Sequence, residues 1–232
     1  MSNEIAIVTG SSSGIGRAVA ARLMADGWRV HGLDRSAPTL SAGSFTPHLV
    51  DLADGAATDA LARTLASATP FALVHAAGVM RVARLGALDA AAGETMWRIH
   101  VDAATRLANH LLPAMRAAGR GRVVLIGSRA ARGLPGRSQY GGVKAALSAQ
   151  AKSWAAEVVA SGVTVNVVSP AATRTAMLDD PARVGTAPHM PPIGRFIQPE
   201  EVASLVAYLL SPAAAALTGQ DIALCGGATL DH

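Results

Sequence analysis

The stretch Ile5-Ala6-Ile7-Val8-Thr9-Gly10-Ser11-Ser12-Ser13-Gly14-Ile15-Gly16 decides how this sequence is interpreted. Residues 4–9 read as a short buried strand with an apolar centre at residues 5–8, and a loop rich in glycine and serine, residues 10–16, follows directly. Over residues 17–25 the apolar positions fall on one side of a helix, which ends at Gly27. A helix N-terminus at such a loop offers free N–H groups and positive potential, so it favours a pyrophosphate. A tight turn without a ligand is the alternative.

Strand and helix patterns alternate along the rest of the chain. We expect helices over residues 55–68, 94–118 (kinked or interrupted at Pro113), 139–160 and 199–210, and further strands over residues 29–34, 48–50, 71–75, 122–127, 163–168 and 221–225. Apolar strands separated by helices are typical of a parallel sheet that is covered on both faces. The sequence therefore predicts an α/β protein of the Rossmann type. Its single domain, residues 1–232, contains a doubly wound, seven-stranded parallel sheet.

Composition limits the class of protein. The chain has 232 residues, of which 50% are apolar and 16% charged, so it can bury a large core and is not expected to be disordered. A single cysteine, Cys225, excludes a disulfide framework and a multi-cysteine zinc site. No apolar run reaches the roughly 18 residues that cross a membrane. The first residues lack a signal-type core, so we expect a cytoplasmic protein.

The positive charge does not indicate a nucleic-acid partner. The net charge is +4, but the cations are scattered, and the densest arginine run, residues 116–137, has no interleaved aromatics for base stacking. Only Lys144 and Lys152 are lysines, which makes their positions notable. We expect no metal site. Apart from His75 and His100, which are considered below, the histidines show no metal-ligand spacing: His31, His48, His110, His189 and His232.

Asp34 ends the second expected strand, about 20 residues after the glycine loop, where a dinucleotide fingerprint has an acid. Its carboxylate can accept both ribose hydroxyls of an adenosine and would repel a 2′-phosphate. Arg35 partly offsets that repulsion, so NAD is favoured over NADP. A surface turn would also explain an aspartate here. Asp51 and Leu52, after the third strand, either reach the adenine edge or form a plain turn.

Tyr140 and Lys144 lie four residues apart at the start of an expected helix and so share one face. A free phenol has a pKa of about 10, and both a nearby cation and the positive end of a helix favour its phenolate. The pair is therefore a candidate proton donor and acceptor, although two ordinary helix residues would show the same spacing. Ser128, twelve residues earlier, either bonds the substrate oxygen or caps a turn.

Taken together, the chain resembles the short-chain dehydrogenase/reductase family, of the small NAD(P)-dependent type, over residues 4–230. The motifs that carry the resemblance are the loop 9–16, Asp34, the turn Ala76-Ala77-Gly78, Ser128, Tyr140 with Lys144, Ser169-Pro170 with Thr175, and the closing Thr218-Gly219-Gln220 and Gly226-Gly227. They occur in the family's order.

The resemblance implies hydride transfer between a nicotinamide cofactor and a secondary alcohol or ketone. Tyr140 would be the general acid/base, Lys144 would hold the nicotinamide ribose and lower the pKa of Tyr140, and Ser128 would position the substrate oxygen. A homotetramer or homodimer is implied as well. The cofactor-binding residues would be Gly10, Ser12, Ser13, Gly14, Ile15, Gly16, Asp34, Arg35, Asp51, Leu52, Ala76, Ala77, Gly78, Tyr140, Lys144, Pro170, Ala171, Thr173 and Thr175.

The sequence departs from the family pattern at several positions. The family's asparagine-containing turn begins here with His75, and His100 replaces the helix asparagine that completes a catalytic tetrad. His100 either relays protons or is a satisfied buried histidine. Ala171 stands where the family has glycine. The spacing from Ser128 to Tyr140 is one residue shorter than the commonest form.

The substrate has to be inferred from the loops. Residues 176–198 are expected to form a lid with an apolar surface, or to pack as a plain loop; its apolar members are Met177, Leu178, Met190, Pro191, Ile193 and Phe196. Arg129, Arg132 and Arg137 either bind a substrate carboxylate or form a solvated rim. The turn Gly78-Val79-Met80-Arg81 and the short stretch from Asp34 to Asp51 are similar to dihydroxybenzoate-forming dihydrodiol dehydrogenases. A cofactor-binding protein with little catalysis is the remaining alternative.

Overall fold

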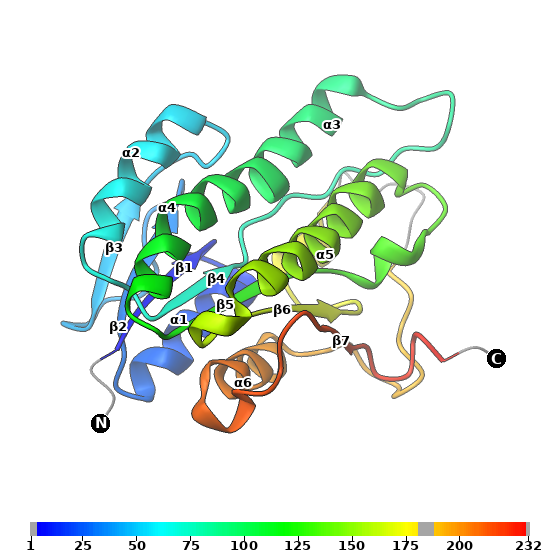
Figure 1. Ribbon diagram of the computed structural model, residues 1–232. Coiled ribbons are helices and arrows are strands. Elements are labelled where there is room, and N and C mark those ends of the chain that lie inside the picture. The colour runs from blue at the N-terminus through cyan, green and yellow to red at the C-terminus, as the bar shows by residue number, and fades with distance from the viewer. Residues whose placement is uncertain (1–3, 181–187, 231–232) are drawn as a thin grey trace.

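A parallel sheet forms the centre of the molecule in the computed structural model, which describes residues 4–180 and 188–230 (Figure 1). Its seven strands lie in the order β3-β2-β1-β4-β5-β6-β7, and every neighbouring pair is parallel. The strands are β1 (Ile5–Thr9), β2 (Arg29–Asp34), β3 (Phe45–Leu49), β4 (Ala72–His75), β5 (Gly121–Ile126), β6 (Val163–Pro170) and β7 (Asp221–Leu224).

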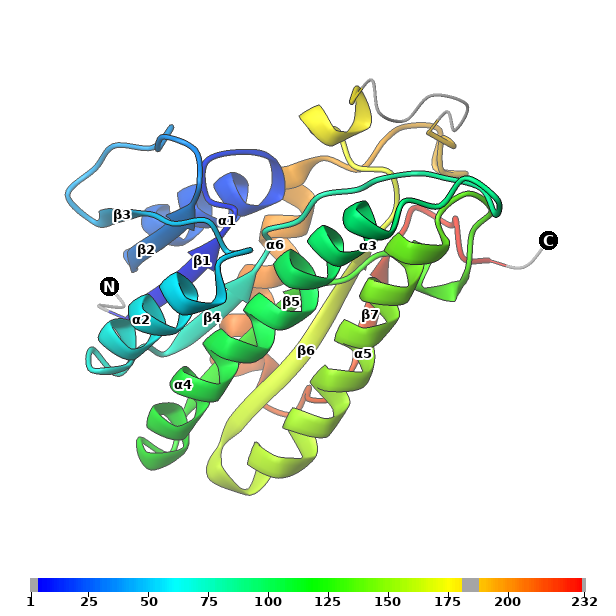
Figure 2. The same ribbon diagram turned by 90° about the horizontal axis from the view of Figure 1, so that it is seen from above.

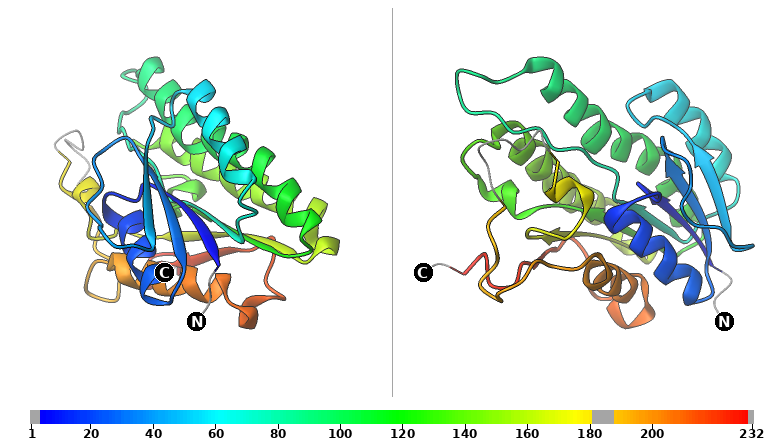
Figure 3. Two further views of the ribbon diagram at one scale, coloured as in Figure 1. Left: turned by 90° about the vertical axis from the view of Figure 1, so that its left-hand side faces the viewer. Right: turned by 180° about the vertical axis from the view of Figure 1, so that it is seen from behind.

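Helices cover both faces of this sheet (Figures 2 and 3). One face packs against α2 (Gly55–Ala66), α4 (Ala103–Ala117) and α5 (Ser138–Val158), and the other against α1 (Gly14–Ala25) and α6 (Pro199–Leu210). Along β1 the side chain of Ile7 belongs to the hydrophobic core on the face covered by α2, α4 and α5. Those of Ala6 and Val8 belong to the core on the face covered by α1 and α6. This alternation explains why the strands are continuously apolar, and it confirms the predicted single-domain, doubly wound α/β fold.

The strand order places a crevice at one edge of the sheet. From β1 the chain builds outward to β2 and β3 on one side, then returns to β4 and continues outward on the other. The carboxyl ends of β1 and β4 therefore flank the point where the direction of winding reverses, which is where open α/β sheets bind ligands. No helix in the described ranges is long and apolar enough to span a membrane.

The third strand is longer and earlier than the predicted residues 48–50, and the reason is Pro47. Proline disfavours a strand assignment in general, but β3 is an edge strand, where a missing N–H donor is tolerated. Phe45 begins the strand and packs over Gly32 of β2, where a Cβ would lie 2.4 Å from the phenyl ring. β6 also extends two residues beyond its predicted end, through Pro170.

The helix predicted over residues 94–118 has its irregularity in a different place. It begins earlier, as α3 (Ala90–Trp97), passes through a π-helical turn η1 (Arg98–Asp102) and continues as α4. Of the two alternatives at Pro113, a kink or an interruption, the interruption is wrong, because α4 runs through that residue to Ala117. The π turn contains the buried His100, and such turns are frequent at functional sites.

Candidate active site

A cleft of about 340 Å³ runs along the carboxyl edge of the sheet, from the glycine loop to the start of α5. It brings together nearly all of the residues that the sequence singled out. Ser12 is the exception: it is buried behind the cleft, and its amide supports Asp34 instead. The predicted site residues that line the cleft are Gly10, Ser13, Gly14, Ile15, Gly16, Asp34, Arg35, Asp51, Leu52, Ala76, Ala77, Gly78, His100, Ser128, Tyr140, Lys144, Pro170, Ala171, Thr173 and Thr175.

The glycine loop is built for close approach of a ligand. Gly10 has a φ of +70°, and a Cβ on Gly16 would lie 2.2 Å from the carbonyl oxygen of Gly10. α1 begins at Gly14, earlier than the predicted residue 17, and the first turn has no acidic residue and no side-chain cap from Ser13. Its first amides therefore remain available to a ligand. This donor set fits a pyrophosphate, since amides at a helix N-terminus and the helix dipole both favour an anion.

Asp34 is held in a fixed orientation at the far end of the cleft. Its Oδ2 accepts a hydrogen bond from the amide of Ser12, and its Oδ1 one from the amide of Ser36, both at 2.9 Å. Each carboxylate oxygen can accept a further hydrogen bond. Asp51 is exposed, and its carboxylate accepts a hydrogen bond from the amide of Ala53, as expected of an aspartate in a turn. It also lines the cleft.

Tyr140 and Lys144 lie together on the inner face of α5. The ammonium of Lys144 is 5.8 Å from the centroid of the Tyr140 ring and donates a 2.6 Å hydrogen bond to the carbonyl of Ile126, at the end of β5. Both side chains are buried, Lys144 with only 4% of its surface exposed. Burial lowers the pKa of Lys144 to about 7, because desolvation penalises the charged form.

Ser128 has the capping role that was one of the two considered from the sequence. It is the N-cap of a short helix, η2 (Arg129–Arg132), that the sequence analysis did not predict, and its Oγ accepts a 3.1 Å hydrogen bond from the amide of Ala130. The same hydroxyl lines the cleft beside Tyr140. Because a hydroxyl donates one hydrogen bond in addition to those it accepts, capping leaves its proton available to a substrate oxygen.

His100 packs directly against Tyr140. Their rings meet edge to face, with centroids 5.7 Å apart, and Nε2 of His100 lies 2.8 Å from the carbonyl oxygen of Val79. Burial, with a smaller effect of Lys144, lowers the pKa of His100 well below its usual value, so the imidazole is neutral. Nε2 also lies 3.1 Å from the amide nitrogen of Val79, so the tautomer decides whether Nε2 donates to the carbonyl or accepts from the amide, and Nδ1 is correspondingly an acceptor or a donor. Nδ1 has no hydrogen-bond partner within residues 4–180 and 188–230. A Cβ on Gly78 would lie 2.3 Å from this ring.

His75 has a structural role that the sequence analysis missed. The hydroxyl of Thr9 accepts hydrogen bonds from the amides of Ala76 and Ala77, at 3.0 Å each, so its proton is donated to Nδ1 of His75. Nε2 of His75 then donates to the carbonyl of Ile99 at 3.1 Å. The neutral ring thus ties β1 and β4 to the π turn. Burial, aided by Lys144, lowers the pKa of His75 to about 3, which keeps it neutral.

The predicted lid only partly lines the cleft. Met177 and Leu178 do so, whereas Met190 and Ile193 are exposed elsewhere, and neither Pro191 nor Phe196 reaches the cleft. Residues 181–187 of the predicted lid lie outside the described residues. Apolar contacts that the sequence analysis did not assign come instead from Val79, Met80 and Leu134. The turn after Gly78 was the available signal for Met80.

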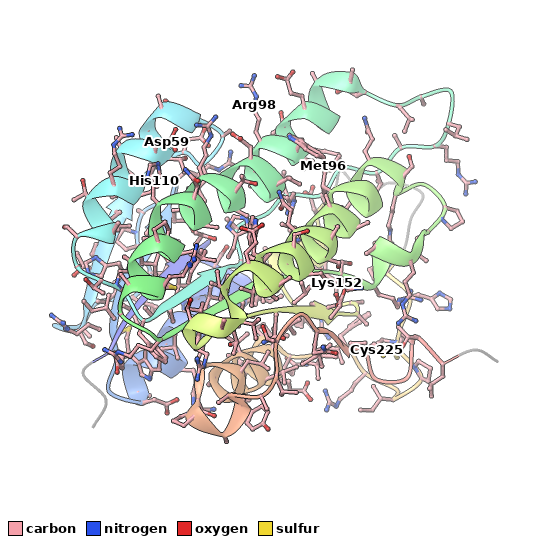
Figure 4. All side chains as sticks on the ribbon, viewed as in Figure 1. Asp59, Met96, Arg98, His110, Lys152 and Cys225 are labelled. Atoms are coloured by element: carbon pink, nitrogen blue, oxygen red, sulfur yellow. The ribbon has the colours of Figure 1, made fainter. Side chains whose placement is uncertain are left out.

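Other clusters of ionisable groups lie away from the cleft. Asp59 on α2 accepts hydrogen bonds from Arg106 and His110 on α4 (Figure 4). Cys225, which follows β7, contacts Thr229 (Figure 4). Within the described ranges, no three His, Cys, Asp or Glu side chains are grouped so that they could hold a metal ion.

Comparison with known proteins places the chain in a family. A family model described as enoyl-(acyl carrier protein) reductase matches residues 10–229. A 2,3-dihydro-2,3-dihydroxybenzoate dehydrogenase of Escherichia coli is 33% identical over 96% of both chains. The chain belongs to the short-chain dehydrogenase/reductase family. Members of this family are oxidoreductases that act on CH–OH groups and use nicotinamide cofactors.

Two further relatives agree with this assignment. A 2-keto-3-deoxy-L-fuconate dehydrogenase of Xanthomonas campestris is 32% identical over 95% of this chain and 78% of its own. A solved structure titled short chain dehydrogenase/reductase family protein matches with a TM-score of 0.89 and 34% identity, over 98% of each chain. Because the likeness covers the whole chain, the short-chain dehydrogenase/reductase assignment applies to the cleft as well as to the sheet.

Proposed function

We propose that this protein transfers hydride between NAD and a secondary alcohol or ketone, with Tyr140 as the general acid/base. One observation carries the proposal: the Tyr140 ring and the buried Lys144 ammonium, 5.8 Å apart, lie beside Ser128 in the cleft that begins at the glycine loop. A proton-transfer pair and a dinucleotide-type loop in one cleft match the two halves of such a reaction.

The residues present fit a dinucleotide. The free amides at the start of α1 would hold the pyrophosphate, and Asp34 would accept the ribose hydroxyls. Thr173 and Thr175, beyond β6, would face the nicotinamide side. The fixed negative charge of Asp34 supports NAD over NADP, because a 2′-phosphate would be repelled there. When bound, NAD supplies the hydride acceptor or NADH the donor; the remaining chemistry belongs to the protein.

Tyr140 would move the proton that accompanies the hydride. In the reductive direction the substrate carbon gains a hydride while its oxygen takes the phenolic proton, which leaves an alcohol and a phenolate. The Lys144 ammonium stabilises that phenolate, and Ser128 holds the same substrate oxygen by donating its hydroxyl proton. In the oxidative direction each transfer is reversed.

His100 would support this proton transfer through its contact with Tyr140. Its ring fixes the tilt of Tyr140 by the edge-to-face contact, and its unpartnered Nδ1 would donate or accept, according to the tautomer, in a proton relay that includes Lys144. The presence of Ser128, Tyr140 and Lys144 in one cleft argues against a cofactor-binding protein with little catalysis. We also propose a homotetramer or homodimer, as the family resemblance implies, which light scattering can test.

A narrower candidate is a dihydrodiol dehydrogenase that acts on a carboxylated cyclic diol. It is supported by the similarity to the Escherichia coli dihydrodihydroxybenzoate dehydrogenase over 96% of the chain. The apolar wall formed by Met80, Leu134 and Met177 would suit the ring of such a substrate.

A spectrophotometric screen tests the proposed function. NADH and NADPH are offered separately with a panel of linear and cyclic ketones, and NAD and NADP with the matching secondary alcohols. We expect turnover with at least one cyclic substrate and a clear preference for NADH. If the folded protein binds NADH but transfers hydride to none of the ketones, the proposed function is wrong.

A further inference from the structure

The charges that line the cleft are unevenly distributed. Its acidic residues, Asp34 at the end of β2 and Asp51 after β3, lie with Arg35 at the end where the sheet would meet the adenosine. At the opposite end, around β5 and α5, the charged groups are cationic: Arg129, Arg137 and Lys144. No acidic side chain from the described residues lines that end of the cleft.

Arg137 is a half-buried cation without a counterion. It lies just before α5, and within residues 4–180 and 188–230 its guanidinium has neither an ion pair nor a side-chain hydrogen bond. Burial lowers the pKa of Arg137, the charge of Tyr140 raises it and that of Arg129 lowers it. Arg137 is therefore close enough to both groups to interact with them. An incompletely solvated charge of this kind is stabilised when a ligand supplies the opposite charge.

Arg129 brings a second guanidinium to the same wall. Its Nη1 donates a 3.0 Å hydrogen bond to the carbonyl of Ala228, which anchors the side chain to the turn after β7. An arginine has five N–H donors, so the rest of the fork stays available. Arg129 also has no ion pair to a residue that the structure describes. The two cations repel each other, and an anion between them would remove that repulsion.

We propose that Arg129 and Arg137 form a subsite that binds a carboxylate on the substrate, beside Tyr140. This deepens the proposed function and rests on it, because it names the substrate class of the same cleft. A carboxylate matches the planar donor fork of arginine. The neighbouring wall is apolar, with Met80, Leu134 and Met177, and so suits the hydrocarbon body that would carry the acid and the reacting carbon.

Arg132 provides a matched control. It lies in the same short helix η2 as Arg129, but it is exposed and does not line the cleft. Substitution of Arg132 by Gln removes the same charge from the same segment without touching the subsite. Long-range effects of net charge would therefore appear in this variant too, whereas a local effect would not.

Binding is tested first, with benzoate and the neutral benzamide titrated calorimetrically into the NADH-loaded protein. Benzoate should bind more tightly than benzamide, and R137Q should weaken benzoate binding about 10- to 100-fold, the value of a charge-assisted hydrogen bond. R129Q should weaken it in the same direction, R137K should restore part of the affinity, and R132Q should leave it unchanged. Thermal melts confirm that each variant is folded.

Three results of this titration would overturn the subsite. One is equal binding of benzoate and benzamide by the unmodified protein. Another is an equal loss of benzoate affinity in R132Q and R137Q. The third is tighter binding of phenyl phosphate than of benzoate, which would make the site one for phosphate esters.

Kinetics separate this proposal from the proposed function. 3-Oxocyclohexanecarboxylate and its carboxamide are compared as ketone substrates; R137Q should raise KM for the acid alone and leave kcat for both unchanged. If neither ketone is reduced, the proposed function fails, but the benzoate titration still decides the subsite. If both are reduced equally well, the function holds and the subsite is wrong. An equal fall in kcat for both in R137Q would show that Arg137 only tunes Tyr140.

Discussion

Substitution of Lys144 by Met should change stability and activity in different ways. The sign of the change in stability should depend on pH. Burial lowers the pKa of Lys144 from 10.5 to about 7. At 1.36 kcal/mol per pKa unit, this is a cost of about 5 kcal/mol for keeping the ammonium in the folded protein. Below pH 7 the lysine is charged in both states, and the full cost applies. As the pH rises from about 7 to 10.5, the folded protein releases this proton before the unfolded chain does, and the cost disappears.

Urea unfolding of both proteins at one protein concentration measures this linkage. Below pH 7 the methionine variant should have a higher unfolding free energy than the unmodified protein, because it buries no charge. The gain is reduced by the loss of the hydrogen bond to the carbonyl of Ile126. The unfolding free energy of the unmodified protein, minus that of the variant, should then rise by about 1.36 kcal/mol per pH unit. Between pH 7 and pH 9 that amounts to about 2.3 kcal/mol, because at pH 7 the slope has reached only half of its full value. Groups that Lys144 does not influence cancel in the difference, and His75 and His100, whose pKa values Lys144 lowers, are already neutral above pH 7.

The same variant should lose turnover most strongly below about pH 7, where Lys144 of the unmodified protein is charged and can stabilise the phenolate of Tyr140. A stability difference that stays constant between pH 6 and pH 10 would refute the argument, since it would mean that Lys144 titrates alike in the folded and unfolded chains. Retained activity in the methionine variant would refute the assigned role of the ammonium.

Three further substitutions test separate parts of the site. Gly16→Ala places a Cβ 2.2 Å from the Gly10 carbonyl and should abolish NADH binding, measured by fluorescence titration; binding at the unmodified affinity would contradict the loop assignment. Gly78→Ala places a Cβ 2.3 Å from the His100 ring and should lower kcat more than NADH affinity, measured by steady-state kinetics. An unchanged kcat would contradict a role of His100 in the reaction. Asp34→Ala should reduce the preference for NADH over NADPH, compared as kcat/KM; unchanged discrimination would refute the role of this carboxylate.

The fold was predictable because its signals are local and repeated. Continuous apolar strands, helices with one apolar face and the glycine loop after β1 all specify the same layered arrangement. β3 was the weakest element, because Pro47 carries a local signal against a strand and only its edge position resolves the conflict. The start of α1 was placed late for a similar reason: glycine has low helix propensity, but at a helix N-terminus that cost is small.

The site was predictable where its residues follow strand ends or helix spacing, as Asp34, Tyr140 and Lys144 do. Contacts between distant segments were not. Nothing local shows that His75 would bond both Thr9 and the π turn at Ile99, or that η2 would direct Arg129 into the cleft and Arg132 away from it. These outcomes depend on tertiary packing, which single-sequence patterns do not encode.

The transfer of a proton by Tyr140 is the central claim, and Tyr140→Phe tests it most directly. The substitution removes one oxygen and keeps the ring that packs against His100 and Lys144. With a substrate found in the ketone screen, the variant should bind NADH as before, while kcat falls by about 10²- to 10⁴-fold. A folded, NADH-binding variant that turns over as fast as the unmodified protein would contradict the mechanism.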